Sequence, residues 1–352
     1  MPRVSADDLH GLVADILLAA GADARNANRV GDALVLSNLS GVDTHGVFHL
    51  PAYVSLIKEG LLVPTAWPEI VKETATTALV RGNWTFGHVV AKYATDLAVS
   101  KAREQNVAVV SFMQATHIGR LGEYSEIAAS QGMVCQVWAS GYGEEQPVAV
   151  PYGGRTPALH TDPISMGFPG EAEPPMVLDF ATTTIAGSKV RLAQQRGQQV
   201  PPNSLVDAEG NPTTDPSAWP AGGLLPFGGH KGYALMLANE LMGRALSGAD
   251  GYAEAHRGGP TMRHQGVTII VLKADLFQPQ AEFTRRADEL VQRMRAVPPA
   301  AGFEEVLVPG DLEERARATR RQEGIPVLDD VWQALVDLAA ELGVSLPTVE
   351  LE

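Results

Sequence analysis

The sequence predicts a mixed α/β protein with helical segments at both ends and a sheet-rich middle. Apolar residues recur at helical spacing near both termini, whereas short apolar runs separated by Pro and Gly clusters fill the middle. The length of 352 residues is sufficient for two or three packed units. We therefore predict a helical part at residues 1–75, a sheet-rich part with inserted helices at 76–280 and a second helical part at 281–352.

Two amphipathic helices are predicted near the N-terminus. In the first, Ser5 is a capping residue with Asp8 at the third position, and Gly21 marks the end. Its inward stripe consists of Leu9, Leu12, Val13, Ile16 and Leu17. The second helix is predicted from Asp23 to Leu39, ahead of Gly41. Its inward residues are Val30, Ala33 and Leu34.

The middle of the chain has the pattern of buried strands. Asn83–Gly87 is predicted to turn into a helix that runs through Ala102, and the β-branched run Val107–Phe112 follows as a strand. Further strands are predicted at the short apolar runs Met133–Trp138, Met176–Phe180 and Val267–Leu272. Cys135, the only cysteine, lies in one of these runs, so we expect a buried side chain and neither a disulfide nor a cysteine metal cluster.

Three further helices are predicted in the last third of the chain. Almost every residue from Lys231 to Ala245 is apolar or small, which predicts a helix buried over most of its surface. Two C-terminal helices carry one apolar stripe each. The stripes consist of Phe283, Ala287, Leu290 and Met294 in the first helix, and of Trp332, Leu335, Leu338, Ala339 and Leu342 in the second, which is bounded by Asp329 and Gly343.

The chain is strongly acidic, with 41 acidic against 27 basic residues and a formal net charge of -14. Such a surface repels phosphate backbones and anionic lipid, so neither nucleic acid nor a membrane is an expected partner. The first residues lack a basic segment followed by an apolar stretch, and no run reaches the roughly 18 uninterrupted apolar residues of a membrane span. We therefore expect a cytoplasmic protein.

The chain lacks the two standard phosphate-binding loops, Gly-x-Gly-x-x-Gly after a strand and the Walker sequence. A Rossmann dehydrogenase is therefore disfavoured. The stretch Gly228–Gly232 leads directly into a predicted helix, and its small residues, the helix N-terminus and the charge of Lys231 suit a phosphate group. An ordinary structural turn is the competing interpretation of this stretch.

His117 is a candidate for proton transfer. It follows a predicted strand directly, at a position where side chains often face a cleft. An imidazole with a pKa of about 6.5 can take a hydroxyl proton while hydride leaves the same carbon. Arg120, three residues on, can pair with a carboxylate or a phosphate. Asp179 ends another predicted strand and can orient a histidine, accept hydrogen bonds from a ribose or cap a turn.

His45 and His49 raise the alternative of a metal site, because a four-residue spacing places two side chains on one helical face. However, Gly46 and Pro51 disfavour a continuous helix, the sequence has no His-Glu-x-x-His pattern, and no cysteine can complete a site. We therefore expect no metal. Two functions of other classes stay open from these residues, a metal-dependent hydrolase and an oligomeric binding protein without catalysis.

Together these motifs resemble the type 2 malate/L-lactate dehydrogenase family, which includes ureidoglycolate, sulfolactate and hydroxycarboxylate dehydrogenases and cyclic imino-acid reductases. The resemblance covers nearly the whole chain and rests on seven segments in the family's order and spacing: Gly41–Tyr53, Asn83–Gly87, Thr116–Tyr124, Gly153–Pro163, Asp179–Lys189, Leu225–Gly243 and Val308–Asp311. It implies a non-Rossmann nicotinamide-binding domain with a largely antiparallel sheet, packed on a helical domain formed by both chain ends. It further implies NAD or NADP as cofactor, with NAD preferred, and a homodimer or larger homo-oligomer with the site near a subunit interface.

The resemblance also implies roles for individual residues. His45 and His117 match the family's two histidines beside the nicotinamide and the substrate. We expect His117 to be the acid/base, and His45 to bind the substrate oxygen or share the proton transfer. Cofactor contacts are expected at His45, Gly119, Arg120, Leu121, Asp179, Phe180, Ala181, Thr182, Lys231, Pro309, Gly310 and Asp311. Substrate contacts are expected at Thr44, His49 and Tyr53.

Three positions depart from the family pattern. Thr44 replaces a usual serine, His49 replaces an arginine that binds the substrate carboxylate in many members, and Asp162 replaces a usual asparagine. The loss of a bidentate cation at position 49 disfavours malate and ureidoglycolate and favours the hydroxycarboxylate dehydrogenase branch. The predicted reaction is hydride exchange between nicotinamide C4 and C2 of a small 2-hydroxy or 2-oxo carboxylic acid, with reduction of a cyclic imino acid as the alternative.

Overall fold

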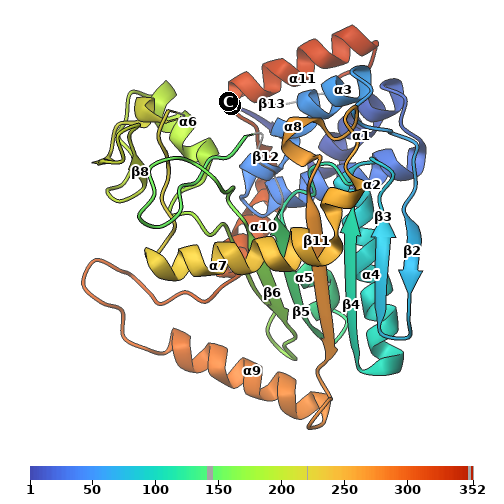
Figure 1. The fold of residues 1–352 in the computed structure, drawn as a ribbon, viewed down its shortest axis with the longest axis vertical. Helices are drawn as coiled ribbons and strands as arrows, with labels where there is room; N and C mark the ends of the chain where they lie inside the picture. Colours follow the sequence, from blue (N-terminus) through green and yellow to red (C-terminus); the bar gives the residue numbers. More distant parts are fainter. Residues whose placement is uncertain (141–145, 220, 348–349, 352) are drawn as a thin grey trace.

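Helices from both chain ends pack together at one end of a central sheet (Figure 1). The computed structural model describes residues 1–140, 146–219, 221–347 and 350–351. The central sheet has helices on both faces, and a smaller unit around helix α6 and strand β8 lies to one side of it (Figure 1). The mixed α/β class predicted from the sequence is therefore confirmed.

The central sheet is mostly antiparallel, as predicted. Within the described residues its strands follow the order β2-β3-β4-β11-β5-β6-β7. Only the β3–β4 pair is parallel. The strands are β2 (Glu69–Glu73), β3 (Thr77–Arg81), β4 (Val107–Met113), β5 (Met133–Ser140), β6 (Ile164–Phe168), β7 (Met176–Phe180) and β11 (Gly266–Lys273).

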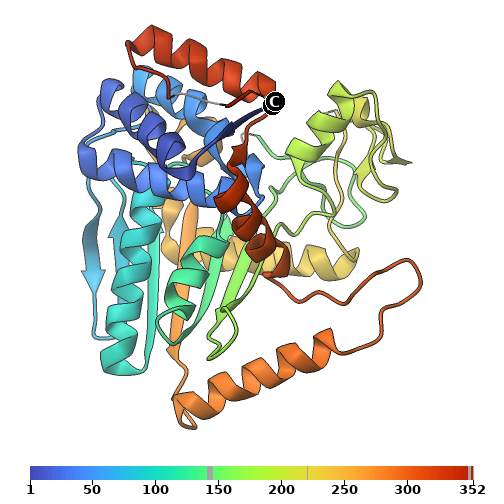
Figure 2. The ribbon, with the colours of Figure 1, turned by 180° about the vertical axis from the view of Figure 1, so that it is seen from behind.

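The sheet centre is buried because three apolar strands lie side by side. β11 pairs along its whole length with β4 and β5, and their alternate residues Val110, Val137 and Ile269 are completely buried. Helices α4 (Gly87–Gln105) and α5 (Gly122–Ala129) cover one face (Figure 2). Alanines at helical spacing let α4 lie close to the strands. Cys135 on β5 is also completely buried, which confirms its predicted environment.

The two chain ends share one hydrophobic core. As predicted, Ser5 caps α1 (Ala6–Ala19) by accepting a hydrogen bond from the Asp8 amide, and Asp23 caps α2 (Ala24–Leu39). Residues of these helices pack in one cluster with Leu335 and Ala339 of α11 (Asp329–Leu342). Strand β1 (Pro2–Val4) pairs with both β12 (Ile325–Pro326) and β13 (Glu350–Leu351). The boundaries after residues 75 and 280 stay predictions.

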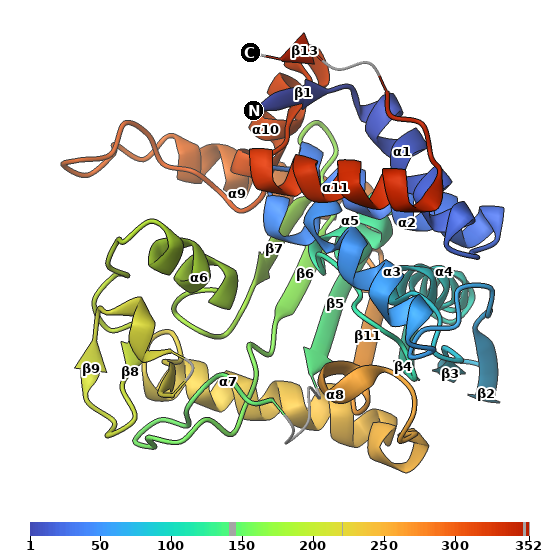
Figure 3. The same ribbon diagram turned by 90° about the horizontal axis from the view of Figure 1, so that it is seen from above.

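Helix α7 (His230–Glu240) differs from the sequence prediction. It crosses the other face of the sheet and continues through a π-helical turn, Leu241–Ala245 (Figures 1 and 3). One stripe, Gly232, Met236, Asn239 and Gly243, is buried, but the opposite stripe of Ala234, Leu237, Leu241 and Ala245 is exposed. The prediction that this helix is buried over most of its surface was therefore wrong, because a helix lying on a sheet buries only one side.

The remaining elements extend from this body. A short sheet lies beside α6 (Gly187–Gln195) and consists of β8 (Leu205–Val206), β9 (Pro212–Thr213) and β10 (Gly223–Leu224). Helix α9 (Gln280–Arg295) lies beyond the end of the sheet that is opposite α11, and the segment 296–310 returns from it to α10 (Asp311–Glu323) (Figure 2). The other helices are α3 (Leu50–Lys58) and α8 (Gly259–Met262). Among the described residues, no helix combines the length and apolar character needed to span a membrane.

Candidate active site

Three histidines form one wall of a cavity. His45 and His49 end two successive 3₁₀ turns, Asp43–His45 and Val47–His49, and His117 follows β4. The ring centroids of His49 and His117 are 4.4 Å apart, and those of His45 and His117 are 5.7 Å apart. The break between the turns at Gly46 confirms that no continuous helix joins His45 to His49.

The two turns are fixed by a polar network beneath them. Asn38 at the end of α2 accepts a hydrogen bond from the Val47 amide at 2.9 Å and donates one to Asp43 at 2.7 Å. Arg320 on α10 forms two hydrogen bonds with the same Asp43 carboxylate. A Cβ at Gly46 would overlap the Asn38 side chain, so the turn requires glycine there. The C-terminal helices thus help to position the histidine wall.

Tyr53 on α3 holds one nitrogen of the His117 ring. Its hydroxyl lies 2.7 Å from His117 Nδ1, and its side chain is only 2% exposed. Within the described residues no hydrogen bond is found for His117 Nε2, and His117 lines the cavity. Nε2 is therefore the nitrogen that remains for a ligand. Tyr53, an expected substrate contact, bonds His117 and is not among the residues that line the cavity, so its contact with substrate stays a prediction.

His88 packs behind the same wall, although no sequence pattern marked it as a site residue. It is 1% exposed, and its ring meets those of His117 and Tyr53 edge-on. Gly119 has φ +73°, and a Cβ there would lie 2.6 Å from His88 Nε2. Glycine at this position is therefore needed both for the backbone conformation and for the close approach of His88.

All three wall histidines are uncharged at neutral pH. Burial lowers the pKa of His45 to about 4, with repulsion from His49 and Arg120 as further causes. Burial holds the pKa of His117 well below its ordinary value, and the other histidines lower it further. The pKa of His49 is also lowered, mainly by burial, although the Thr44 carbonyl that bonds its Nε2 opposes the shift. A neutral ring is a proton acceptor.

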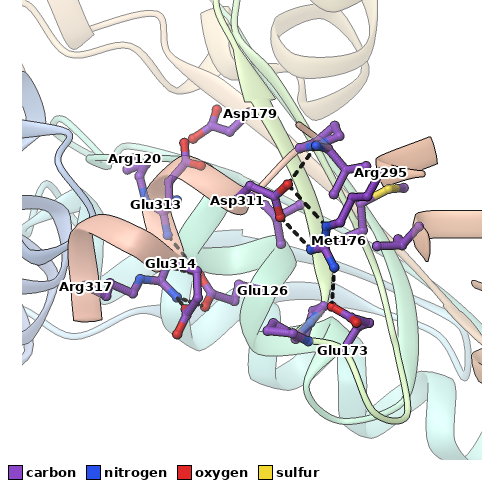
Figure 4. Close-up of a pocket in the computed structure, with 17 residues that line it drawn as sticks. Arg120, Glu126, Glu173, Met176, Asp179, Arg295, Asp311, Glu313, Glu314 and Arg317 are labelled. Carbon is purple, nitrogen blue, oxygen red and sulfur yellow. Dashed lines mark hydrogen bonds and ion pairs between the residues drawn. The ribbon is translucent and has the colours of Figure 1, made fainter. Parts of the chain in front are cut away.

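The cavity in front of this wall has a volume of about 620 Å³, within the ordinary range for ligand sites. Most of the predicted site residues line it: Thr44, His45, His49, His117, Gly119, Arg120, Leu121, Asp179, Phe180 and Ala181. A second cavity of about 220 Å³ is lined by Pro309, Gly310 and Asp311 (Figure 4). Arg120, Asp179 and Glu313 line both, so the two cavities meet at these three residues.

Two predicted cofactor contacts lie outside both cavities. Lys231 is exposed at the start of α7 and lines neither of them. Thr182 is completely buried, and its hydroxyl donates to the carbonyls of Thr161 and Asp162 at 2.9 and 3.1 Å. Thr182 thus supports the backbone of the cavity wall. Contact of either residue with a cofactor stays a prediction.

The cavity contains further polar residues that the sequence analysis missed. His160 lies on the segment before β6, and Arg191 lies on α6 beside Lys189. Burial lowers the pKa of His160 to about 3. His160 lies within Gly153–Pro163, one of the segments that carry the family resemblance, but no role was expected for it. Arg191 lies outside all seven segments, so no sequence pattern marked it. Among the described residues, no group of three or more potential ligands could bind a metal ion.

Comparisons with known proteins identify the family of this chain. The model of the malate/L-lactate dehydrogenase family matches residues 4–336. This chain belongs to the malate/L-lactate dehydrogenase family. It is 35% identical to L-sulfolactate dehydrogenase of Methanocaldococcus jannaschii over 95% of this chain and 96% of that one. A solved structure of sulfolactate dehydrogenase from the same organism has a TM-score of 0.89 and 33% identity, covering 98% of both chains.

Other relatives in the family differ in the substrates that their names give. The chain is 33% identical to hydroxycarboxylate dehydrogenase B of Escherichia coli O157:H7, over 99% of this chain and 96% of that one. It is also 33% identical to a Δ(1)-pyrroline-2-carboxylate/Δ(1)-piperideine-2-carboxylate reductase of Pseudomonas putida, over 96% of each. The family resemblance inferred from the motifs is confirmed, and the chain is an oxidoreductase of this nicotinamide-dependent family.

Asp162 has a buried carboxyl group beside the cavity. It is fully buried, has φ +36°, and neither of its carboxyl oxygens has a well-formed hydrogen bond. Burial and then the neighbouring Glu240 carboxyl on α7 raise its pKa well above the ordinary value. The folded protein therefore binds a proton here at a pH where the unfolded chain has lost it. Protonated Asp162 is compatible with its buried site, so its full contribution to the free energy of unfolding is present at low pH. This contribution is lost as the pH rises toward the raised pKa of Asp162.

We predict that Asp162→Asn stabilises the protein at pH 8 by about 1–3 kcal/mol, because an amide removes the cost of ionising a buried carboxyl. The gain should shrink at pH 5, and urea unfolding at the two pH values measures it. Glu240→Gln should give a similar gain, and the double variant should add little to either. Loss of stability in Asp162→Asn at pH 8 would contradict this account.

Proposed function

We propose that the chain transfers hydride between a nicotinamide dinucleotide and C2 of a small 2-hydroxy or 2-oxo carboxylic acid, with His117 as the acid/base. The observation that supports this most directly is the orientation of His117. Tyr53 occupies Nδ1, the ring is neutral, and the residue lines a cavity large enough for a ligand. A fixed neutral imidazole at a cavity wall is the arrangement that general-base catalysis requires.

The two connected cavities fit a dinucleotide. Their combined lining runs from the histidines, past Arg120 and Asp179, to the loop before α10. Arg120 Nε is buried without a hydrogen-bond partner, although Nη2 of the same side chain bonds Glu126 at 2.9 Å. A buried, unsatisfied guanidinium nitrogen is a suitable donor to an anionic group. When bound, the nicotinamide would supply or accept the hydride.

In the proposed reaction, the residues of the histidine wall have different roles. In oxidation, His117 Nε2 takes the hydroxyl proton, which requires the neutral ring to carry its own proton on Nδ1. The Tyr53 oxygen accepts the hydrogen bond from this Nδ1 proton both before and after the transfer. His45, whose Nδ1 lies 3.2 Å from Thr44 Oγ1, binds the substrate oxygen. In reduction the same proton returns from His117 to the oxygen formed at C2.

A cyclic imino acid is a second candidate substrate. The reductase of Pseudomonas putida acts, by its name, on two cyclic imine carboxylates. Such a substrate needs the same hydride geometry, with the proton going to nitrogen instead of oxygen. A metal-dependent hydrolase would instead show chelator-sensitive activity without any change in nicotinamide absorbance.

We predict that His117→Gln lowers kcat by about 10²–10⁴-fold, because it removes the proton acceptor. Dinucleotide binding, measured by NADH fluorescence, should change little. Because burial lowers the pKa of His117, kcat/KM for oxidation should stay flat down to about pH 6, where an ordinary histidine is partly protonated. His256→Gln, a change of an exposed histidine, is the control. Full turnover in His117→Gln would disprove the assignment.

We propose NAD rather than NADP as the cofactor, from the charges in the smaller cavity. Its described lining includes six carboxylates (Glu126, Glu173, Asp179, Asp311, Glu313 and Glu314) and three arginines (Arg120, Arg295 and Arg317). Each arginine already pairs with a carboxylate, as Arg295 does with Asp311 at 2.6 Å and with Glu173 at 2.7 Å (Figure 4). The 2′-phosphate of NADP would be repelled by the net negative charge of this cavity and would find no unpaired arginine among its described lining residues.

Wild-type protein is therefore expected to bind NADH at least tenfold more tightly than NADPH, measured by fluorescence titration. Glu173→Lys should improve NADPH binding about tenfold with a smaller effect on NADH, because it removes one of the two carboxylates paired with Arg295 and adds a cation. Glu305→Lys makes the same charge change at a residue that lines neither cavity. It should leave the ratio of NADH affinity to NADPH affinity unchanged. Preference of the wild type for NADPH would refute the proposal.

We also propose a homodimer that covers the exposed stripe of α7. Leu237 and Leu241 in this stripe are 41% and 65% exposed, and Leu246 just beyond it is 58% exposed. A continuous apolar stripe on a helix whose other side is already buried is typical of a subunit interface. A second copy of the chain is the occupant that the family resemblance implies.

Size-exclusion chromatography with light scattering should give twice the mass of one chain for the wild type. Leu241→Glu places a charge in the centre of the stripe and is expected to shift the protein to monomer at micromolar concentrations. Leu18→Glu, a change at an exposed leucine of α1, should leave the dimer intact. A dimeric Leu241→Glu protein would exclude α7 as the interface.

A further inference from the structure

His49 provides no positive charge for the carboxylate of the proposed substrate. His49 is uncharged, and its Nε2 bonds the Thr44 carbonyl at 2.9 Å. An anionic substrate in a protein of net charge -14 needs a cation inside the cavity. Some other residue of the cavity must therefore supply positive charge if the proposed substrate class is correct.

The cations of the larger cavity differ in whether they are already paired. Arg120 forms an ion pair with Glu126 at 2.9 Å. Lys189 and Arg191, both on α6, form no ion pair with a carboxylate in the described part of the chain. Of these two, Arg191 can form two parallel hydrogen bonds with a carboxylate, whereas lysine provides a single point charge.

Arg191 is placed by its neighbours so that its charge acts inside the cavity. Its guanidinium carbon lies 5.8 Å from the centroid of the Trp219 ring, which also lines the cavity. Its positive charge reaches His49, where it adds to burial in lowering the pKa of that ring. Helix α6 lies on one side of the ends of β6 and β7, and α3, which follows His49, lies on the other (Figure 3).

We propose that Arg191 binds the carboxylate of the substrate, in place of an arginine at position 49. The proposal rests on the function proposed above and names the residue that selects its substrate. The carboxylate then points toward α6, while the oxygen on C2 points toward His117 on the opposite wall. Arg191 is exposed on a helix outside the central sheet, so it is accessible to a substrate from solvent.

This arrangement also has a consequence for the choice of substrate. An arginine at position 49 would stand next to His45 and His117, whereas Arg191 approaches from the far side of the cavity. Phe48, Phe180 and Trp219 line the same space. A 2-oxo acid with an apolar or small side chain, and a single carboxylate, fits these surroundings better than a dicarboxylate does.

The experiment uses the full-length protein saturated with NADH and oxamate as an unreactive mimic of a 2-oxo acid. Arg191→Gln is expected to weaken oxamate binding, and to raise KM for reactive 2-oxo acids, by about 10- to 100-fold. The effect on kcat should be smaller. NADH binding should stay within about twofold of the wild-type value, because the cofactor does not use this residue.

Matched variants distinguish the effect of the Arg191 charge on oxamate binding from the effect of its position and geometry. Arg191→Lys should recover part of the affinity, since it restores the charge without the two-pronged geometry. Arg196→Gln removes an exposed arginine at the end of the same helix that lines neither cavity, and it should change nothing. Adding His49→Arg to Arg191→Gln should restore oxamate binding and improve activity on dicarboxylates.

Unchanged oxamate binding in Arg191→Gln would overturn the proposal. Equal weakening of NADH and oxamate would also overturn it, because Arg191 would then bind the cofactor. A wild-type protein that binds NADH but no member of a panel of 2-oxo acids would remove the substrate class and this assignment with it. Failure to bind either nicotinamide dinucleotide, in contrast, would refute the proposed function itself.

Discussion

Close packing of uncharged imidazoles is the constraint on which the active site depends. The ring centroids of His45, His49 and His117 are between 4.4 and 6.3 Å apart. Positive charges at such distances repel strongly where water is largely excluded, and burial itself disfavours the charged form. The rings therefore remain neutral, and a neutral ring is the form that accepts a proton from a hydroxyl group. The packing that lowers the pKa values thus also keeps these rings in the form that the proposed base requires.

This packing requires parts of the chain that are distant in sequence. The turns with His45 and His49 follow α2, whereas His117 follows the central strand β4, and Tyr53 of α3 joins the two through its bond to His117. Arg320, near the other end of the chain, fixes the turns through Asp43. Residues from both chain ends therefore help to position the histidines of the candidate site.

Charge is distributed unevenly along the cleft. Near the histidines, Lys189 and Arg191 have no carboxylate partner within the described residues, whereas each arginine of the smaller cavity is paired. The first environment suits an anionic substrate and the second suits neutral ribose hydroxyls. Two side chains add to this pattern: His49 is an uncharged residue of one wall, and Asp162 is a buried acid beside the cavity.

The sequence by itself determined the family, the bounds of many elements and the identity of the central histidines. Caps such as Ser5 and Asp23, and short apolar runs such as Met176–Phe180, are local signals, so α1, α2 and β7 were predicted nearly to the residue. Only the tertiary structure decided that Tyr53 orients His117, that His88, His160 and Arg191 join the site, and that one stripe of α7 is left exposed. These features depend on strand order and helix packing between residues far apart in the chain, and a local pattern carries no information about such contacts.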